Sequence, residues 1–274
     1  MLQKFLQASS QEYSHKKLGL ERIQEVLMRL DHPESVYPSV LIAGTNGKGS
    51  TLRLVESVCL EAGLLVGAYT SPHLESFTER IRVGGQEVSE AFLEEVLQEL
   101  LAKNILNPAG EILNQSGERL TWFEKVTVLA FEVFKRKKIS LALLEVGLGA
   151  RLDATNVVDP LVSAITSIAK DHTEVLGDSL FEIAKEKLAV ARKDRPLILG
   201  PMDLKVRVFL MESAKMLGAK PLMPKSVQGP ASDFSYGPLE HLKLNTLGEY
   251  ILKNAATALE ILIALKQAGF DINN

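Results

Sequence analysis

The chain has 274 residues, of which 46% are hydrophobic and 24% charged, and its formal net charge is −3. This composition is typical of a globular protein with one large domain or two modest ones, and it excludes the strongly basic character of many nucleic-acid-binding proteins. The sequence has no apolar run of the length that a membrane-spanning helix needs, and its single cysteine, Cys59, excludes an intrachain disulfide. Because the N-terminus also lacks a signal-peptide pattern, we expect a cytoplasmic protein that binds neither nucleic acid nor a membrane.

Apolar runs of strand length alternate with longer amphipathic segments along the chain. The pattern predicts helices over 19–30, 50–62, 89–103, 122–136, 180–191, 203–217 and 248–268, and strands over 39–43, 64–69, 141–146, 162–168 and 196–199. Such alternation indicates an α/β fold with a mostly parallel sheet flanked by helices. Residues 107–118 are rich in turn formers and predict a loop, whereas 225–245 predict a small antiparallel β element. No segment has the composition of an interdomain linker.

A glycine-rich loop follows the first predicted strand and precedes a predicted helix. It comprises Gly44, Thr45, Asn46, Gly47, Lys48, Gly49 and Ser50. Glycines allow backbone N–H groups to approach phosphates, a lysine reaches the outer phosphates, and a hydroxyl can ligate Mg²⁺. The N-terminus of the following helix also favours an anion. The spacing is shorter than that of a standard phosphate-binding loop, so a plain glycine-rich turn between strand and helix remains an alternative.

Polar side chains follow three other predicted strands. Ser71 comes after the strand at 64–69, Glu145 lies near the end of an apolar strand, and His172 follows another. Each has an ordinary alternative: a Ser/Thr turn, a salt-bridged carboxylate and a structural histidine. Because ligands gather at the carboxyl ends of parallel strands, we expect the three to lie near the glycine-rich loop. Oxygen ligands suit Mg²⁺, whereas a histidine is less usual for this ion.

Several segments, taken in order, are similar to one enzyme family. They are Leu18-Gly19-Leu20-Glu21-Arg22-Ile23, the loop from Gly44 to Ser50, Thr70-Ser71-Pro72-His73-Leu74, Phe77-Thr78-Glu79-Arg80-Ile81, Leu120-Thr121-Trp122-Phe123-Glu124, the stretch from Glu145 to Asn156, and Asp171-His172-Thr173. The chain resembles the folylpolyglutamate synthase/dihydrofolate synthase family of the Mur ligase superfamily. The resemblance covers nearly the whole chain and accounts for the shortened loop.

The resemblance implies a fold and an activity. It identifies residues 1–274 as a P-loop NTPase-like Mur ligase ATP-binding domain. It implies an ATP-dependent amide ligase that adds L-glutamate to dihydropteroate, to folylpolyglutamate or to both, through an acyl phosphate and with release of ADP and phosphate. ATP, Mg²⁺, folate or dihydropteroate and L-glutamate are then its ligands, and a monomer is expected. A non-catalytic nucleotide-binding module and a Mur ligase acting on cell-wall precursors remain alternatives.

The same resemblance implies roles for individual residues. Thr45 to Ser50 bind the phosphates, with Lys48 supplying positive charge, and Asn254 lies near the nucleotide base. Ser71, Glu145 and His172 hold Mg²⁺. Lys187 matches a lysine that CO₂ carbamylates, which gives an anion able to bind a second Mg²⁺; by its pattern alone it is an ordinary surface lysine of a helix. The residues that face the pteroate group are Thr121, Trp122, Phe123, Glu124, Leu152, Asp153 and Ala154.

The chain departs from the family pattern at three places. Ala150 stands between Gly149 and Arg151, where the family usually has a second glycine, and Tyr250-Ile251 replace the His-Gln that often precedes the Asn254 motif. The family's smaller C-terminal α/β domain, with its Trp-Pro-Gly-Arg-type motif, has no counterpart here. We therefore expect these 274 residues to bind ATP and Mg²⁺ but not to ligate glutamate efficiently by themselves.

Overall fold

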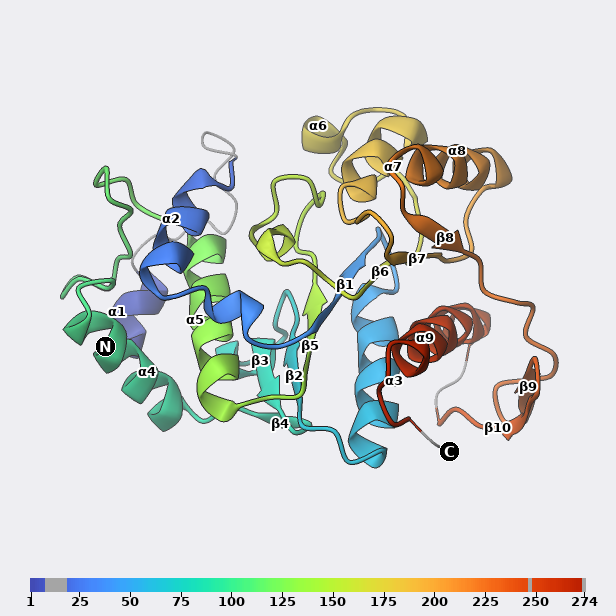
Figure 1. Cartoon of the computed structure of the whole chain (residues 1–274), viewed down its shortest axis with the longest axis horizontal. Coiled ribbons are helices and arrows are strands. Elements are labelled where there is room, and N and C mark those ends of the chain that lie inside the picture. Colours follow the sequence, from blue (N-terminus) through green and yellow to red (C-terminus); the bar gives the residue numbers. More distant parts are fainter. Residues whose placement is uncertain (8–18, 246–247, 273–274) are drawn as a thin grey trace.

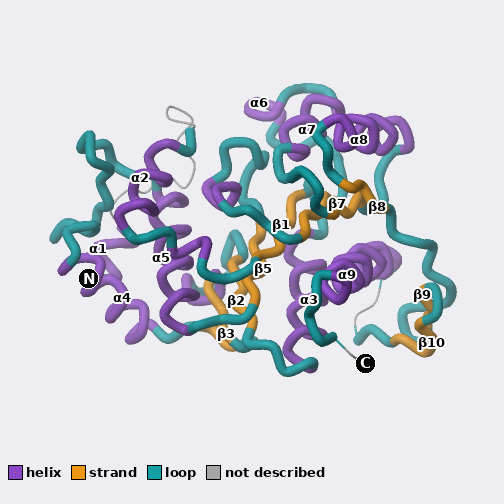
Figure 2. The backbone as a smooth tube through the Cα atoms, in the orientation of Figure 1, coloured by secondary structure: helices purple, strands orange, loops and turns teal. Residues whose placement is uncertain are grey.

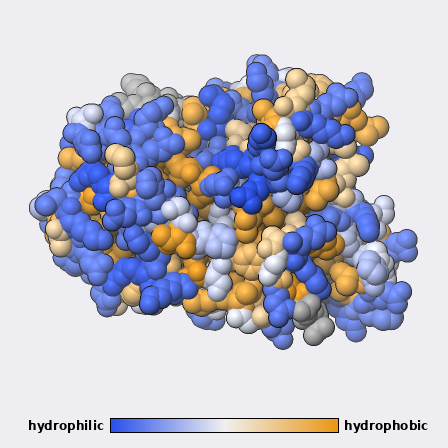
Figure 3. Space-filling model, in the orientation of Figure 1, coloured by the Kyte–Doolittle hydropathy of each residue, from blue (hydrophilic) through white to orange (hydrophobic). Residues whose placement is uncertain are grey.

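The computed structural model describes residues 1–7, 19–245 and 248–272. Leu18, the first residue of one segment quoted above, lies outside this part. Within it, none of the helices combines the length and the apolar character needed to cross a bilayer. Charged and polar side chains cover most of the face shown in Figure 3, and hydrophobic side chains appear between them.

A mixed sheet runs through the middle of the molecule (Figure 1). Its strands are β1 Ser39–Ala43, β2 Val66–Tyr69, β3 Ile81–Val83, β4 Gln86–Glu87, β5 Leu141–Glu145, β6 Val162–Ile165, β7 Pro196–Leu199 and β8 Lys220–Leu222. They pair in the order β4-β3-β2-β5-β1-β6-β7-β8. All neighbours are parallel except the pairs that involve β3 and β4. The expectation of a mostly parallel α/β sheet is therefore confirmed.

Helices cover both faces of this sheet, as the tube view in Figure 2 also shows. They are α1 Leu2–Gln7, α2 Glu21–Arg29, α3 Lys48–Glu61, α4 Glu90–Ala102, α5 Trp122–Lys137, α6 Thr173–Leu176, α7 Leu180–Leu188, α8 Leu204–Met216 and α9 Glu249–Gln267, with short 3₁₀ segments η1 Pro33–Ser35, η2 Phe77–Arg80 and η3 Ala154–Val157. One face packs against α3 and α9, and the other packs against α2, α4, α5, α7 and α8.

The central strands are apolar on both faces, and their side chains alternate between two cores. Val40 and Ile42 of β1 belong to the core beneath α3 and α9, whereas Leu41 and Ala43 belong to the larger core on the opposite face. Residue-by-residue alternation is the geometry of a strand buried on both sides. It fixes the register of β1 and so places the loop that starts at Gly44 at the carboxyl edge of the sheet.

The predicted antiparallel element is confirmed: β9 Phe234–Tyr236 pairs with β10 Leu239–Leu242. The strand predicted over 162–168 was too long, because β6 ends at Ile165 and the residues after it turn to bond the glycine-rich loop. The pattern also missed the short elements α1, α6, β3, β4 and β8. These have two to six residues, too few for a periodic signal to emerge.

Candidate nucleotide and metal site

The glycine-rich loop forms a compact cradle between β1 and α3. Gly44 has φ of +146° and Gly47 has φ of +84°, which favour glycine at both positions. The Lys48 ammonium lies over the loop and donates to the carbonyl oxygens of Gly44 at 3.2 Å and Thr45 at 3.3 Å. Gly47 also precedes the first turn of α3, so the free N–H groups of that helix start face the same side as the cradle.

Residues directly after β6 hold this loop in shape. The Thr45 N–H donates to the Ser167 carbonyl at 2.9 Å, and the Thr45 hydroxyl donates to the Ala169 carbonyl at 3.2 Å. The Asn46 carbonyl accepts from the hydroxyls of Thr166 at 2.7 Å and Ser167 at 3.0 Å. Sequence reasoning missed Thr166 and Ser167 because the predicted strand over 162–168 included them, although two hydroxyls immediately after an apolar run were a signal for a loop contact.

Asn254, on α9, lies against the loop. A Cβ atom built on Gly47 would come within 2.4 Å of the Asn254 Oδ1 atom, so glycine is required for this close approach. The structure therefore places Asn254 beside the glycine-rich loop, at the packed interface between α3 and α9.

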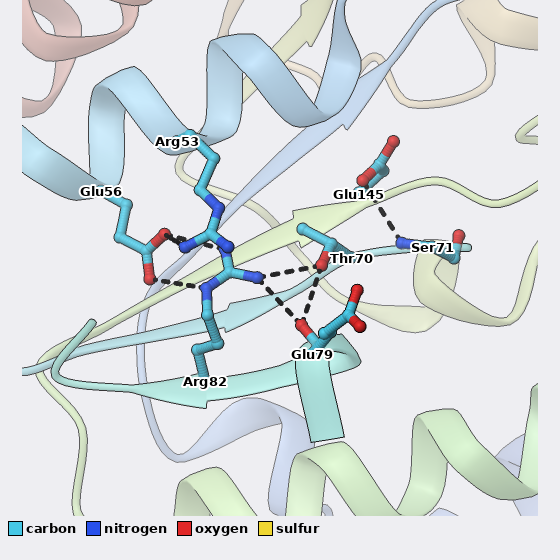
Figure 4. A network of polar contacts seen from close by, with 7 residues as sticks. All are labelled: Arg53, Glu56, Thr70, Ser71, Glu79, Arg82 and Glu145. Atoms are coloured by element: carbon cyan, nitrogen blue, oxygen red, sulfur yellow. Dashed lines mark hydrogen bonds and ion pairs between the residues drawn. The ribbon is translucent and has the colours of Figure 1, made fainter. Parts of the chain in front are cut away.

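Glu145 and Ser71 lie together on the other side of the α3 start. Glu145 ends β5, is 6% exposed, and accepts a hydrogen bond from the Ser71 N–H at 3.3 Å (Figure 4). Burial raises the pKa of Glu145, and the nearby Lys48 ammonium opposes that rise. Both residues line an open hollow of about 510 Å³ together with Gly49 and Ser50. A buried carboxylate that accepts a long hydrogen bond from the N–H of a serine, in a hollow that this serine also lines, offers oxygen donors of the kind that Mg²⁺ prefers.

His172 and Lys187 line a neighbouring cavity of about 30 Å³, which Gly44, Thr45 and Lys48 also border. His172 has φ of +47°, an uncommon conformation for a residue with a side chain, and it directly precedes α6. Its side chain is 51% exposed and lies 3.8 Å from carboxylate oxygens of both Asp171 and Glu174. In Figure 1 the α6–α7 segment lies close to the junction of β1 and α3.

Lys187 is not the surface lysine that its sequence pattern alone predicted. The α7 helix turns this side chain inward, where it is 5% exposed. Burial is the main cause that lowers its pKa to about 8, and the positive charge of Lys48 acts in the same direction. The pattern was misleading because the loop after β5 covers this part of α7, which helix periodicity cannot show.

The predicted metal ligands are thus brought to one edge of the sheet but into two adjoining hollows. Ser71 and Glu145 share one hollow, His172 lies in the other, and Lys48 lies between them. Among the described residues, no group of three His, Cys, Asp or Glu side chains converges as a metal cluster. A bound cation would therefore need the Ser71 hydroxyl or oxygen atoms of a phosphate in addition to side chains of those types.

The first group of predicted pteroate-facing residues starts α5. Thr121 and Glu124 form a capping box, with N–H···O distances of 3.2 and 2.7 Å, and Glu124 pairs with the buried Arg22 at 3.0 Å. Trp122 donates to the Leu6 carbonyl at 3.1 Å. The Phe123 ring lies 5.9 Å from that of Tyr69. These contacts hold the start of α5 against α1, α2 and the end of β2.

The second group lies in the loop after β5. The buried Asp153 carboxylate accepts hydrogen bonds from the N–H groups of Gly147 at 3.0 Å and Leu148 at 2.9 Å, and from Thr155. Burial raises the Asp153 pKa against these hydrogen bonds. Ala154 is 3% exposed, and Leu152 is partly exposed. Asp153 therefore organises the loop from within rather than presenting its carboxylate to solvent.

Ala150, in the same loop, stands where the family usually has a second glycine, and the structure accommodates this change. It is fully buried, and it is not among the residues with positive φ. Alanine therefore adopts the required backbone conformation at this position without strain.

Comparison with known proteins identifies the family. No family model matches the chain. The dihydrofolate synthase/folylpolyglutamate synthase of Escherichia coli is 38% identical over 264 residues, which cover 93% of this chain and 58% of that protein. A probable bifunctional folylpolyglutamate synthase/dihydropteroate synthase of Haloferax volcanii is 42% identical over 201 residues, covering 73% of this chain and 23% of that protein. The chain belongs to the folylpolyglutamate synthase/dihydrofolate synthase family.

Solved structures of this family have the same fold. The Escherichia coli FolC structure in complex with DHPP and ADP superposes with a TM-score of 0.79 at 37% identity, covering 98% of this chain and 61% of that one. A bifunctional folylpolyglutamate synthase/dihydrofolate synthase with Mn, AMPPNP and L-glutamate bound gives a TM-score of 0.78 at 38% identity and is covered to 62%. The chain thus spans about three fifths of these members of the folylpolyglutamate synthase/dihydrofolate synthase family.

Proposed function

We propose that this chain forms the ATP-binding part of a ligase that adds L-glutamate to dihydropteroate, to folylpolyglutamate or to both. One observation carries the proposal: a lysine-bearing glycine-rich loop, the buried Glu145 carboxylate with Ser71, and a His172–Lys187 cavity meet at one edge of the sheet. Relatives that carry this activity in their names, and family structures that contain ADP or AMPPNP, support it.

Lys48 and the backbone of the loop would bind and orient the ATP phosphates. The N–H groups at the start of α3 would face the phosphates, and the Lys48 ammonium, which now lies on the Gly44 and Thr45 carbonyls, would move to the outer phosphates. Phosphoryl transfer depends mainly on such positioning and on neutralisation of charge. Asn254, packed on Gly47, is proposed to lie near the nucleotide base.

Ser71, Glu145 and His172 are proposed to hold Mg²⁺. The buried Glu145 carboxylate beside Ser71 supports this role. Mg²⁺, when bound, neutralises charge on the phosphates. The Ser71 and Glu145 side chains would anchor the cation next to Gly49, on the cradle, where the outer phosphates are expected.

The reaction needs activation because a carboxylate is a poor electrophile. An oxygen of the substrate carboxylate would attack the γ-phosphorus of ATP, the bond to the bridging oxygen would break, and ADP would leave. The amine of glutamate would then attack the carbonyl carbon of the acyl phosphate. The carbon–oxygen bond to phosphate breaks, and the amine loses a proton as the amide forms. The chain's contribution is to hold the γ-phosphate in line by means of Lys48 and the loop.

Two groups of side chains are proposed to orient the pteroate part of the substrate. Thr121, Trp122, Phe123 and Glu124 form the rigid start of α5, and Leu152, Asp153 and Ala154 form the loop after β5. The Asp153 carboxylate would act by fixing the loop backbone, since its oxygens already accept hydrogen bonds from Gly147, Leu148 and Thr155.

Lys187 is proposed to become carbamylated, which would provide an anion for a second Mg²⁺. Its burial and its place in the cavity with Lys48 and His172 support this. A carbamate would also exchange an unfavourable buried ammonium for an anion that faces the cation of Lys48.

The proposal predicts glutamate-dependent release of phosphate. The complete gene product is incubated with ATP, Mg²⁺ and glutamate, and offered dihydropteroate in one reaction and tetrahydrofolate in another. We expect phosphate release that requires glutamate in at least one reaction, and a loss of about 10²-fold or more in Lys48→Ala, because a charge that stabilises phosphoryl transfer is removed. Phosphate release that needs neither pterin substrate nor glutamate would instead indicate a simple nucleotide hydrolase.

A further inference from the structure

Arg82, on β3, lies at the centre of a buried polar network near the candidate metal site (Figure 4). Its Nε and Nη2 atoms donate to the Glu56 carboxylate of α3 at 3.3 and 2.8 Å. Both side chains are 3% exposed. Replacement of a buried ion pair by apolar residues is often neutral or stabilising. Stability alone is therefore a weak reason for this pair to exist at this position.

The remaining donor group of Arg82 reaches the end of β2. Nη1 donates to the Thr70 hydroxyl at 3.1 Å and to the Glu79 carbonyl at 3.0 Å. The Thr70 N–H donates to the Arg80 carbonyl at 3.0 Å. Thr70 is thereby fixed by both its backbone and its side chain, and it directly precedes Ser71.

From Thr70 the contacts continue to the candidate metal ligands. The Ser71 N–H donates to Glu145 at 3.3 Å, and the Glu145 carboxylate lies against Gly49 on the phosphate loop. Glu56 is on α3, the helix that the phosphate loop starts. Arg82 therefore connects the phosphate-binding helix to the strand end that carries the Ser71 hydroxyl.

We propose that Arg82 is a positioning residue for the divalent cation. It holds Thr70, and through it Ser71, so that the Ser71 N–H stays on the Glu145 carboxylate and both residues stay at the hollow that they line. Glu56 has a different role. Its carboxylate balances the positive charge of the buried Arg82 guanidinium, which would otherwise repel a cation bound nearby. This inference rests on the proposed function, since the cation is the one assigned there to Ser71, Glu145 and His172.

The test measures Mn²⁺ affinity by electron paramagnetic resonance in the presence of a saturating non-hydrolysable ATP analogue. Arg82→Lys keeps the charge but loses the planar fork that bonds Glu56 and Thr70 together. We expect it to weaken Mn²⁺ binding by about 10- to 100-fold, the range typical when a partner of a metal ligand is changed. Thr70→Val removes the hydroxyl that accepts from Arg82 and donates to the Glu79 carbonyl at 3.4 Å, and it should weaken binding in the same direction by a smaller factor.

Two further variants separate positioning from charge. Glu56→Gln leaves the guanidinium uncompensated and should also weaken Mn²⁺ binding. Arg119→Lys is the control for a change of arginine to lysine in an ion pair away from the hollow. The Arg119 side chain pairs with the Glu111 carboxylate at 2.8 Å but is 73% exposed, and neither residue lines the hollow of Ser71 and Glu145. We expect its Mn²⁺ affinity to stay within about twofold of the parent, since exposed pairs contribute little.

The outcomes are distinct. Parent-like Mn²⁺ affinity in folded Arg82→Lys overturns the inference. So does an equal loss of ATP-analogue affinity without metal, because the whole phosphate site would then have changed. If Arg82→Lys does not fold, Thr70→Val decides: parent-like Mn²⁺ affinity in that variant overturns the inference. A parent protein that binds the analogue without any effect of Mn²⁺ contradicts the proposed function itself.

Discussion

Burial and the nearby carboxylates have opposite effects on the pKa of Lys187, and the effect of burial is the larger. Burial and Lys48 lower its pKa, whereas Asp171 and Asp153 raise it, and the result is about 8 instead of 10.5. At pH 8 about half of the amine is then neutral, against about 0.3% for an ordinary lysine. Because only the neutral amine attacks CO₂, Lys187 is chemically suited to form a carbamate, and its place in the cavity with Lys48 distinguishes it from Lys125, whose pKa burial also lowers to about 8.

We predict that Lys187 carries a carbamate whose amount rises with pH. With ¹³C-labelled bicarbonate and fixed dissolved CO₂, nuclear magnetic resonance should show a carbamate carbon that increases between about pH 7 and pH 9, as the amine loses its proton. Lys187→Arg should abolish the signal. The matched variant Lys185→Arg, which changes an exposed lysine of the same helix, should keep it. A signal that survives in Lys187→Arg would refute this assignment.

Glu145 and Lys187 differ in how much the sequence alone shows about them. A polar or metal partner for Glu145 could be predicted, because a carboxylate that ends an apolar strand is costly unless something pairs with it. The burial of Lys187 was not predictable, because its spacing on α7 is the same whether a loop covers it or water does. The Arg82–Glu56 pair was equally hidden, since β3 itself was too short to predict.

At the scale of elements, α3 is the part of the molecule on which the site depends most. Both of its ends are made by glycines in the left-handed region: Gly47 with φ of +84° and Gly63 with φ of +79°. Only the first is crowded, by Asn254 of α9, whereas a Cβ on Gly63 would meet nothing within 4 Å. The two glycines thus share a backbone requirement and differ in their surroundings.

This difference gives a matched pair of substitutions. Gly63→Ala should lower the free energy of unfolding by about 1–2 kcal/mol, the usual cost of a left-handed conformation for alanine. Gly47→Ala should lower it by at least as much, because its Cβ also meets Asn254. Only Gly47→Ala should also weaken binding of an ATP analogue, by about tenfold or more, because its Cβ displaces Asn254 and alters the cradle. Denaturant unfolding and calorimetric titration measure the two effects. Equal nucleotide affinities in both variants would argue against a role for the Gly47–Asn254 contact.

The sequence predicted the elements that carry long periodic patterns and missed the connections between them. The strands β1 and β7 have the predicted limits, because each is an apolar run bounded by turn residues. The bonds from Thr166 and Ser167 to Asn46 were missed, since they join residues about 120 positions apart. A local pattern of apolar residues shows that a segment can form a strand. It does not show at which residue tertiary contacts end that strand, as they do after Ile165 of β6.

At the scale of the whole molecule, the parallel topology explains why the candidate site residues meet. β1, β2, β5 and β6 are adjacent in the sheet, so the residues that follow them share one edge although they are far apart in the chain. The alternation of strands and helices was enough to predict this arrangement. Which of the residues share a hollow was not predictable, because that depends on how the loops after β5 and β6 fold.

The central claim is that this edge of the sheet binds ATP together with a divalent cation, and calorimetric titration with a non-hydrolysable ATP analogue tests it most directly. We predict one binding site whose affinity rises when Mg²⁺ is present, falls at least about tenfold in Lys48→Ala, and no longer responds to Mg²⁺ in Glu145→Gln. Binding of the analogue that is unchanged by Mg²⁺ and by both substitutions would contradict the account.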